Sequence, residues 1–335
     1  MAILLTGGAG YIGSHMAHHL IDLGVSEVVV LDDLSSGFEW SLPGGIPFIR
    51  ASVGDFTAVD AAINRFGIDT IVHFAASTVV PESIANPFKY YRNNTENSLV
   101  LLQAAAANGV RRFIFSSTAA VYGSSSDRPI PEEAPTLPES PYGWSKLMTE
   151  QMLQDIASQA SIDFVILRYF NACGADALMR TGQSTKNATH LIKVAAEAAL
   201  ELRPGLDIYG VDYPTPDGTC VRDYVHVSDL VAAHIHALDY LARGGKSEIF
   251  NCGYGHGHSV KDVIEVVKRV SGSNFQVSIK PRRTGDPAVS VANSKKIRTV
   301  LNWEPRFDDL DTIVQHALAW QARLATQGNN AATIL

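Results

Sequence analysis

A tyrosine and a lysine four residues apart open the segment ESPYGWSKLMTEQ. Tyr142 and Lys146 follow a proline-rich loop and would share one face of a helix, because positions i and i+4 lie one turn apart. A free tyrosine has a pKa of about 10 and is a poor base at neutral pH. A nearby ammonium, and a positively charged nicotinamide ring, both favour the phenolate. The pair is therefore a candidate proton-abstracting base.

A run of small residues ends the apolar stretch that precedes this pair. The segment IFSSTAAVYG carries three hydroxyls, Ser116, Ser117 and Thr118, and then Ala119 and Ala120. Hydroxyls at the end of a buried strand could hydrogen-bond a reacting oxygen. The two alanines could pack at a strand–helix junction, or they could matter because they leave acid groups out of a reaction site.

Four glycines near the N-terminus form a candidate dinucleotide loop. The segment LLTGGAGYIGSH places Gly7, Gly8, Gly10 and Gly13 between an apolar strand and a helix. Glycines permit the tight turn and let the backbone approach a pyrophosphate at the helix N-terminus. Asp32 follows about 20 residues on, where a carboxylate binds the adenosine ribose and would repel a 2′-phosphate. The pattern predicts NAD rather than NADP; a glycine turn that only packs a helix is the alternative.

Two further polar segments end expected strands, where open sheets bind their ligands. Asp55, in the segment GDF, could bind adenine or could be a plain turn carboxylate. The segment HFAAS, residues 73–77, ends the next strand.

Five motifs together resemble one enzyme superfamily. TGGAGYIGSH, SSTAAVYG, PYGWSK, LRYFNACG and GTCVRDYVHVSDL resemble the extended short-chain dehydrogenases/reductases, and within them the bacterial UDP-glucose 4-epimerases. The resemblance covers nearly the whole chain. It implies an α/β fold, a Rossmann-type doubly wound parallel sheet with a smaller mixed α/β substrate domain. Residues 1–172, joined again by about 222–255, would bind NAD, and residues 173–335 would bind the sugar nucleotide.

The resemblance also implies roles for individual residues. Tyr142 would be the base, Lys146 its orienter and a ribose ligand, and Thr118 the assisting hydroxyl. The implied NAD contacts are Gly7, Gly10, Tyr11, Ile12, Gly13, Asp32, Asp33, Ser36, Gly37, Asp55, Phe56, Phe74, Ala75, Ala76, Asn94, Ser116, Tyr142, Lys146 and Phe170. The implied substrate contacts are Thr118, Tyr142, Asn171, His190, Leu191, Asp207, Tyr209, Arg222, Arg283, Asp286 and Ser290. Arginines from two separate loops suit a bidentate grip on a diphosphate, although each alone could be a surface charge.

The residues after Thr118 bear on which reaction is expected. In the superfamily, hydride leaves sugar C4 for NAD while a base removes the hydroxyl proton. The related 4,6-dehydratases carry an Asp-Glu pair next, and a related decarboxylase a glutamate, where this chain has Ala119 and Ala120. Without those groups we expect hydride to return to the ketone, which predicts a 4-epimerase, and the resemblance implies UDP-glucose and UDP-galactose as its substrates. A nucleotide-sugar dehydrogenase, a pentose or uronate 4-epimerase and a non-catalytic NAD-binding regulator remain alternatives.

Three positions depart from the pattern of several relatives. Thr78 stands where some have a lysine near the cofactor phosphates, and His190 where some have asparagine. Ser290 falls at a position where a tyrosine restricts the sugar pocket in some members. A serine frees volume beside sugar C2, so we hypothesise that UDP-N-acetylglucosamine and UDP-N-acetylgalactosamine are also accepted.

Alternating short apolar runs and amphipathic stretches predict the elements that position these residues. Such alternation indicates a parallel sheet covered on both faces. The expected strands are Ala2–Thr6, Glu27–Leu31, Pro47–Arg50, Thr70–Phe74, Arg112–Ser116 and Asp163–Arg168.

Composition narrows the class of protein. The 335 residues are 46% hydrophobic and carry a formal net charge of −7, which argues against a nucleic-acid surface. We expect no membrane segment, because no apolar run approaches the ~20 residues that a membrane helix needs. Three widely spaced cysteines suit a reducing cytoplasm rather than a disulfide framework. The GHGH segment, 255–258, is typical of a turn more than of a metal site, since no cysteine or carboxylate cluster accompanies it.

The resemblance finally implies a homodimer. Residues 90–109 and 145–160 would form helices that pair across a two-fold axis. The sequence itself indicates only that both segments are amphipathic.

Overall fold

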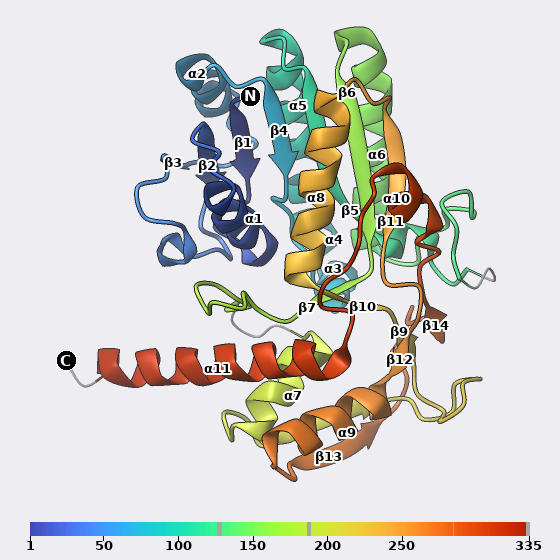
Figure 1. Cartoon of the computed structure of the whole chain (residues 1–335). Helices are drawn as coiled ribbons and strands as arrows, with labels where there is room; N and C mark the ends of the chain where they lie inside the picture. The colour runs from blue at the N-terminus through green and yellow to red at the C-terminus, as the bar shows by residue number, and fades with distance from the viewer. Residues whose placement is uncertain (126–128, 186–188, 284, 333–335) are drawn as a thin grey trace.

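A seven-stranded parallel sheet forms the upper part of the molecule (Figure 1). The computed structural model describes residues 1–125, 129–185, 189–283 and 285–332. The strand order across the sheet is β11-β6-β5-β4-β1-β2-β3. The bounds are β1 Ile3–Thr6, β2 Val28–Asp32, β3 Phe48–Arg50, β4 Thr70–His73, β5 Arg112–Thr118, β6 Asp163–Tyr169 and β11 Glu248–Cys252.

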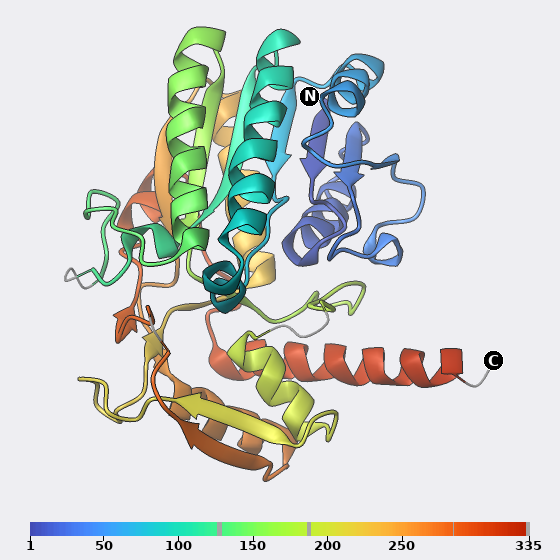
Figure 2. The ribbon, with the colours of Figure 1, turned by 180° about the vertical axis from the view of Figure 1, so that it is seen from behind.

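Helices cover both faces of this sheet, which explains why its central strands are apolar along their whole length. Figure 1 looks onto the face covered by α1 (Tyr11–Asp22) and α8 (Val227–Ala242). Figure 2 shows the opposite face, covered by α2 (Phe56–Phe66), α5 (Asn97–Ala107) and α6 (Pro141–Ala160). Each face has its own hydrophobic cluster of strand and helix side chains.

The expected strands are confirmed to within two residues at each end. The largest difference is at β5, which runs on to Thr118 because Ser117 and Thr118 pair with Arg168 and Tyr169 of β6. The expected helix over 90–109 is interrupted: α4 (Pro87–Tyr90) and α5 are joined by a π-helical turn, η2 (Tyr91–Glu96).

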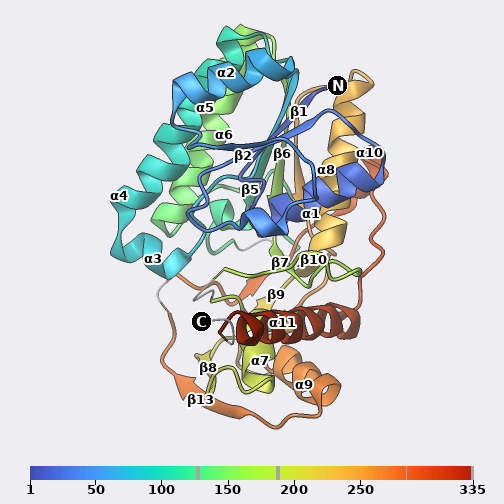
Figure 3. The ribbon, with the colours of Figure 1, turned by 90° about the vertical axis from the view of Figure 1, so that its left-hand side faces the viewer.

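A smaller lobe lies at the carboxyl end of the sheet (Figure 3). It contains α7 (Leu191–Ala199), α9 (Val260–Ser271), α11 (Leu310–Ala332) and the parallel pair β8 (Gly205–Tyr209) and β13 (Gln276–Lys280). The strands of the large sheet point toward this lobe, so residues at their carboxyl ends face it.

Short strands connect the two parts. β7 (Asn171–Cys173) pairs with β10 (Tyr224–His226), and β9 (Val221–Arg222) lies between β12 (His258–Ser259) and β14 (Val289–Ser290). The remaining short helices are η1 (Glu39–Ser41), α3 (Val80–Ala85), η3 (Ala119–Tyr122) and α10 (Lys295–Val300). No helix in the described ranges is long and apolar enough to cross a membrane.

A buried carboxylate at the start of α8 joins this helix to two loops. Asp229 accepts hydrogen bonds from the Tyr254 hydroxyl at 2.6 Å and from the amides of Arg306 and Phe307, each at 2.9 Å. Losing the acceptor would leave one buried hydroxyl and two partly buried amides without this partner, which is costly.

Asp229→Ala should therefore lower the free energy of unfolding by about 3 kcal/mol, measured by urea denaturation followed by circular dichroism. Asp239→Ala is the matched control, because Asp239 lies exposed on the same helix. We expect the control to change stability by less than about 0.5 kcal/mol. Equal stability of the two variants would contradict this role for Asp229.

Candidate active site

The glycine turn between β1 and α1 is held by close backbone contacts. Gly7 has φ +69°, and a Cβ there would lie 2.5 Å from the Ala75 nitrogen. A Cβ on Gly13 would lie 2.2 Å from the Gly7 carbonyl oxygen. Gly10 occupies the N-cap of α1 and supplies no side-chain cap. The first-turn amides of α1 therefore have no side-chain oxygen from the cap position, which fits an anionic ligand at this helix end.

Asp32 at the end of β2 faces this turn. Its buried carboxylate accepts hydrogen bonds from the amides of Ala9 at 2.9 Å and Leu34 at 2.8 Å. Burial raises the pKa of Asp32, and the two hydrogen bonds oppose that shift. Gly37 lies on the other side of the turn, where a Cβ would meet the Ala9 carbonyl oxygen at 2.7 Å. The glycine turn and the loop after β2 thus form one continuous cradle.

The other predicted cofactor residues lie in different environments. Asp33 and Ser36 are exposed in the loop after β2, and Asp33 accepts from the Ser35 amide at 2.8 Å. Asp55 caps α2 by accepting from the Ala58 amide at 3.1 Å, a local role that the turn alternative anticipated. The rest comprise partly buried Tyr11 and Ile12 on α1, exposed Phe56 on α2, partly buried Phe74, Ala75 and Ala76 after β4, and buried Phe170 after β6.

Asn94 joins the loop after β4, the π-helical turn η2 and the start of α6. It lies in the π-helical turn η2, and its side-chain nitrogen donates to the Ser77 carbonyl and the Ser145 hydroxyl, each at 2.9 Å. Its side-chain oxygen accepts from the Ser77 amide at 2.8 Å. Ser145 in turn donates to the Tyr142 carbonyl at 2.8 Å. The π-helical turn therefore helps to fix the start of α6.

The hydroxyl strand and the Tyr–Lys helix meet at the carboxyl end of β5. The Thr118 hydroxyl lies beside the Tyr142 phenol, and both side chains are buried. Lys146, one turn further along α6, donates to the Ser116 carbonyl at 2.8 Å, and its Nζ lies 4.6 Å from the centre of the Phe115 ring. The Ser116 hydroxyl bonds to His234 of α8 at 3.1 Å. These three predicted reaction residues therefore lie together.

Burial sets the protonation of this pair. It raises the pKa of Tyr142, while the hydrogen bond with Thr118 opposes the rise. It lowers the pKa of Lys146 to about 7, while the charge of Glu150 opposes the fall. The sequence predicts a lowered pKa for Tyr142, but the pKa is raised in the protein without a bound cofactor. Lowering it therefore requires positive charge in addition to that of Lys146.

Ala119 and Ala120 begin the 3₁₀ turn η3. Thr118 caps this turn, since its hydroxyl accepts from the Ala120 amide at 3.1 Å. Gly143 of α6 comes so close that a Cβ would lie 2.7 Å from the Ala120 carbonyl oxygen. The alanines are thus a packing junction, and neither side chain can transfer a proton.

A second group of predicted residues gathers on the short sheet of the smaller lobe. Ser290 pairs with Arg222 across β14 and β9. The Arg222 guanidinium lies 3.8 Å from the Asp286 carboxylate. The Arg283 guanidinium lies 3.8 Å from the centre of the Tyr209 ring. The segment 283–286 therefore brings a cation to the Tyr209 ring of β8 and a carboxylate to the Arg222 guanidinium of β9.

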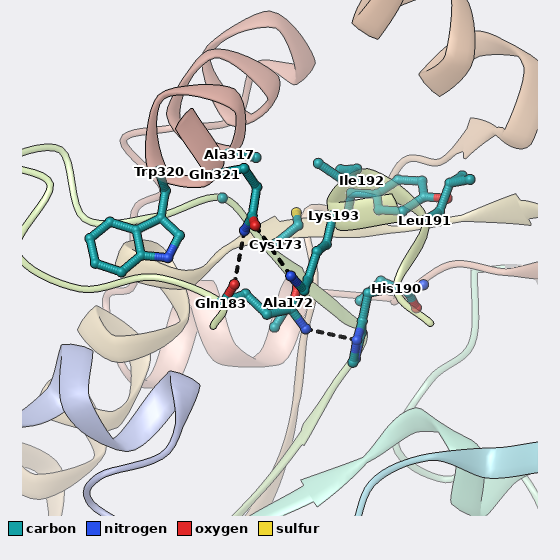
Figure 4. A pocket seen from close by; sticks show the side chains of 13 residues that line it. Ala172, Cys173, Gln183, His190, Leu191, Ile192, Lys193, Ala317, Trp320 and Gln321 are labelled. Carbon is teal, nitrogen blue, oxygen red and sulfur yellow. Dashed lines mark hydrogen bonds between the residues drawn. The ribbon is translucent and has the colours of Figure 1, made fainter. Parts of the chain in front are cut away.

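A pocket between β7, α7 and α11 contains three more predicted residues, Asn171, His190 and Leu191 (Figure 4). His190 bonds to Gln183 at 2.7 Å, and Gln321 of α11 donates to the Gln183 carbonyl at 2.9 Å. Asp207, the remaining member, is exposed on β8, on the same face as Tyr209 by strand alternation.

Several residues of this region were missed by the sequence analysis. Gln183, Gln321 and Trp320 line the pocket, and Glu150 lies next to the hydroxyl strand. Each finds its partner far along the chain or across two elements, so no local spacing identifies it. Of the departures, Thr78 is exposed after β4. The GHGH segment places His256 2.7 Å from Asp308, and no group of three or more His, Cys, Asp or Glu suited to a metal occurs among the described residues.

Comparison with known proteins agrees with this geometry. Residues 3–253 match the model of the NAD dependent epimerase/dehydratase family. The chain is 52% identical to the UDP-glucose 4-epimerase of Azospirillum brasilense, covering 96% of this chain and 92% of that protein.

Two solved structures extend the comparison. A UDP-glucose-4-epimerase from Stenotrophomonas maltophila with bound NAD and formylated UDP-arabinopyranose has a TM-score of 0.93 and 37% identity, covering 98% of this chain and 99% of that one. The UDP-Glc/GlcNAc 4-epimerase of Campylobacter jejuni has a TM-score of 0.83 and 46% identity, covering 96% and 99%. The chain belongs to the NAD-dependent epimerase/dehydratase family.

Proposed function

We propose that this protein is an NAD-dependent UDP-glucose/UDP-galactose 4-epimerase. The observation that carries the proposal is that Tyr142 and Thr118 are buried side by side, with the Lys146 ammonium one turn away and no proton-transferring side chain at Ala119 or Ala120. The relatives at 52% and 46% identity are named for this activity and support it.

The glycine turn, the bare N-terminus of α1 and the Asp32 carboxylate fit NAD. The pyrophosphate would lie at Gly10 and the first turn of α1, and the adenosine ribose at Asp32. The nicotinamide would lie toward Ser116, Tyr142 and Lys146. When bound, NAD supplies the acceptor and donor of the hydride exchanged with sugar C4.

The side chains of this protein handle the proton. Tyr142, as phenolate, takes the proton from the C4 hydroxyl and later gives it back, and the Thr118 hydroxyl fixes the phenol oxygen. The Lys146 ammonium stabilises the phenolate and is itself fixed by the Ser116 carbonyl. A 4-keto sugar is left in a site with no acid at 119 or 120 to assist elimination, so reduction to either C4 epimer is the open course.

The nucleotide would be held in the smaller lobe. Arg222 and Arg283 suit the diphosphate, and Asp286 can accept from ribose hydroxyls. Tyr209 would flank the uracil, with Asp207 beside it. Asn171, His190 and Leu191 would complete the substrate contacts along the pocket wall. Anchoring only the nucleotide would leave the sugar free to present either face to the hydride donor.

We also propose the division of labour between parts of the chain. Residues 1–172 with about 222–255 would form the NAD-binding domain, which the return of β11 to the large sheet supports. Residues 173–335 would form the sugar-nucleotide domain. A reducing cytoplasm would suit the three buried free thiols, Cys173, Cys220 and Cys252.

The activity is tested by incubating the protein with UDP-galactose and no added reductant. We expect UDP-glucose without net NADH; stoichiometric NADH would indicate a dehydrogenase, and a 4-keto-6-deoxy product a dehydratase. Tyr142→Phe should lower turnover by about 10³-fold while bound NAD is retained, because it removes the base. Tyr240→Phe, a tyrosine on α8 that packs against Phe250, is the matched control. Near-normal activity of Tyr142→Phe would overturn the assignment of the base.

The N-acetylated substrates are tested at Ser290. A serine opposite Arg222 leaves volume beside sugar C2, and the Campylobacter relative is named for both substrates. Ser290→Tyr should lower the ratio of UDP-N-acetylglucosamine to UDP-glucose activity by at least about 10-fold, measured as kcat/KM for each substrate. Ser290→Ala keeps the volume and should preserve the ratio. An unchanged ratio in the tyrosine variant would refute this gate.

We further propose a homodimer formed through α3, α4, η2 and α6. Exposed apolar side chains gather on these packed elements: Phe88 is 86% exposed, Ile84 49%, Met148 42% and Trp144 41%. Apolar surface of this kind suits a second copy of the chain.

Sedimentation velocity should therefore give a dimer for the wild type and a monomer for Phe88→Glu, since a carboxylate cannot be buried there without a partner. Leu178→Glu places the same charge on a loop side chain that is 70% exposed elsewhere, and should remain a dimer. A dimeric Phe88→Glu variant, or a monomeric wild type, would count against this interface.

A further inference from the structure

A buried ion pair lies directly behind the reaction residues. Glu150 of α6 is 0% exposed, and Arg168 of β6 is 5% exposed. The Arg168 guanidinium donates to both Glu150 oxygens, at 2.6 Å from its terminal nitrogen and 3.1 Å from Nε. The Ser117 hydroxyl donates to the same carboxylate through a short hydrogen bond.

The position of this carboxylate relates it to the reaction residues on both sides. Glu150 follows Lys146 by one helical turn, so the two side chains lie on neighbouring turns of the same face of α6. Its partner Ser117 lies between Ser116, whose carbonyl accepts from Lys146, and Thr118, which lies beside Tyr142. One carboxylate therefore ties α6 to β5 and β6 at the point where these three elements carry the reaction residues.

Few charges face the Lys146 ammonium in this water-poor region. The phenols of Tyr142 and Tyr169 are uncharged at neutral pH, because burial raises the pKa of each. His73 of β4 is uncharged as well, because burial and the neighbouring ammonium lower its pKa to about 3. Among the described residues, the charged group that acts on Lys146 is Glu150 on the same helix, and Arg168 of β6 is the ion-pair partner of Glu150.

A purely stabilising role explains this pair poorly. Burying two charges costs about as much as their attraction returns, and apolar replacements of such pairs are often neutral or stabilising. Such a pair has a functional role where one of its charges acts on a third group. Here the third group is an ammonium that burial pushes toward its neutral form.

We propose that Glu150 is a positioning residue of the epimerase reaction, which keeps Lys146 positively charged and holds the hydroxyls of β5 in register with α6. The proposal rests on the proposed function only in its expected effect on turnover. The effect on the charge of Lys146 is a property of the protein itself, so it can be measured whatever reaction the protein catalyses.

The sign of the effect follows from the charges. Lys146 is an ammonium below its pKa and neutral above it. The Glu150 charge raises the pKa of Lys146 against the effect of burial, so removing that charge lets the pKa of Lys146 fall further. The charged form that supports the Tyr142 phenolate is then lost at a lower pH.

The decisive measurement is the NMR titration of Lys146 in protein labelled with ¹³C at lysine Cε, its resonance assigned by its loss in Lys146→Met. The wild-type midpoint should lie near the lowered pKa of about 7. In Glu150→Gln it should fall by about one pH unit, and the alkaline limb of the kcat profile for UDP-galactose should move with it. Arg168→Lys keeps the charge but loses the bidentate geometry, and should leave both midpoints within about 0.3 pH units.

A second variant guards against loss of fold. Glu150→Leu/Arg168→Met removes both charges together, which a buried pair tolerates better than the loss of one partner. Its lysine midpoint should fall as in Glu150→Gln, since the supporting carboxylate is gone. Circular dichroism and bound NAD are measured for all variants.

The outcomes of these measurements distinguish the role of Glu150 from the proposed function. An unmoved lysine midpoint in folded Glu150→Gln and in the double variant would overturn the role of Glu150, even if turnover fell. An equal shift in Arg168→Lys would do the same, because geometry rather than charge would then be responsible. A wild type that does not epimerise UDP-galactose would refute the proposed function and leave the titration as an independent answer on Glu150.

Discussion

The burial of the Lys146 ammonium is the constraint on which the reaction centre depends. An unpaired cation is costly inside a protein, and its charged form persists only where nearby groups compensate it. Here the compensation comes from the Ser116 carbonyl, the face of the Phe115 ring and the Glu150 carboxylate. The contacts with Ser116 and Phe115 require α6 to lie close against β5, whereas Glu150 lies on the same helix as Lys146. Gly143 meets this requirement near the helix start, where any side chain would strike the Ala120 carbonyl.

That close approach also determines what the end of β5 can do. The Thr118 hydroxyl accepts from the Ala120 amide and lies beside the Tyr142 phenol. The strand end, the 3₁₀ turn and the helix are therefore locked together around the phenol. Small residues at 119 and 120 permit this packing and, at the same time, supply no acid or base at these two positions. Packing and chemistry are explained by the same two alanines.

The two lobes contribute different parts of the candidate site. The carboxyl ends of the parallel strands lie together at one edge of the large sheet. This edge carries the candidate base and the cradle for the cofactor. The smaller lobe contributes one arginine against a tyrosine ring and a second arginine near a carboxylate. Strands β7 and β10 run between them, and the contacts of Gln183 with His190 and Gln321 join the pocket wall to α11 (Figure 4). A nucleotide held at the second lobe would present its sugar to the first.

Local patterns predicted a large share of this molecule. The strand boundaries followed from apolar runs because a sheet covered on both faces demands continuous apolar strands. The glycine turn with Asp32, and Tyr142 with Lys146, were found because their spacings are those of a turn and of one helical turn. The substrate residues of the smaller lobe were known only through family resemblance, since irregular loops have no period to read.

The sequence by itself therefore determined the sheet, the cofactor loop and the placement of Tyr142 and Lys146 one helical turn apart, whose geometry is local. Only the tertiary structure decided how their charges are balanced. Glu150 meets Arg168 from another element, Ser290 meets Arg222 after 68 residues, and Asn94 reaches Ser145 through a π-helical turn that no pattern signalled. Such partners are set by how helices and strands pack, because burial and contact distance depend on the whole fold rather than on neighbours in the chain.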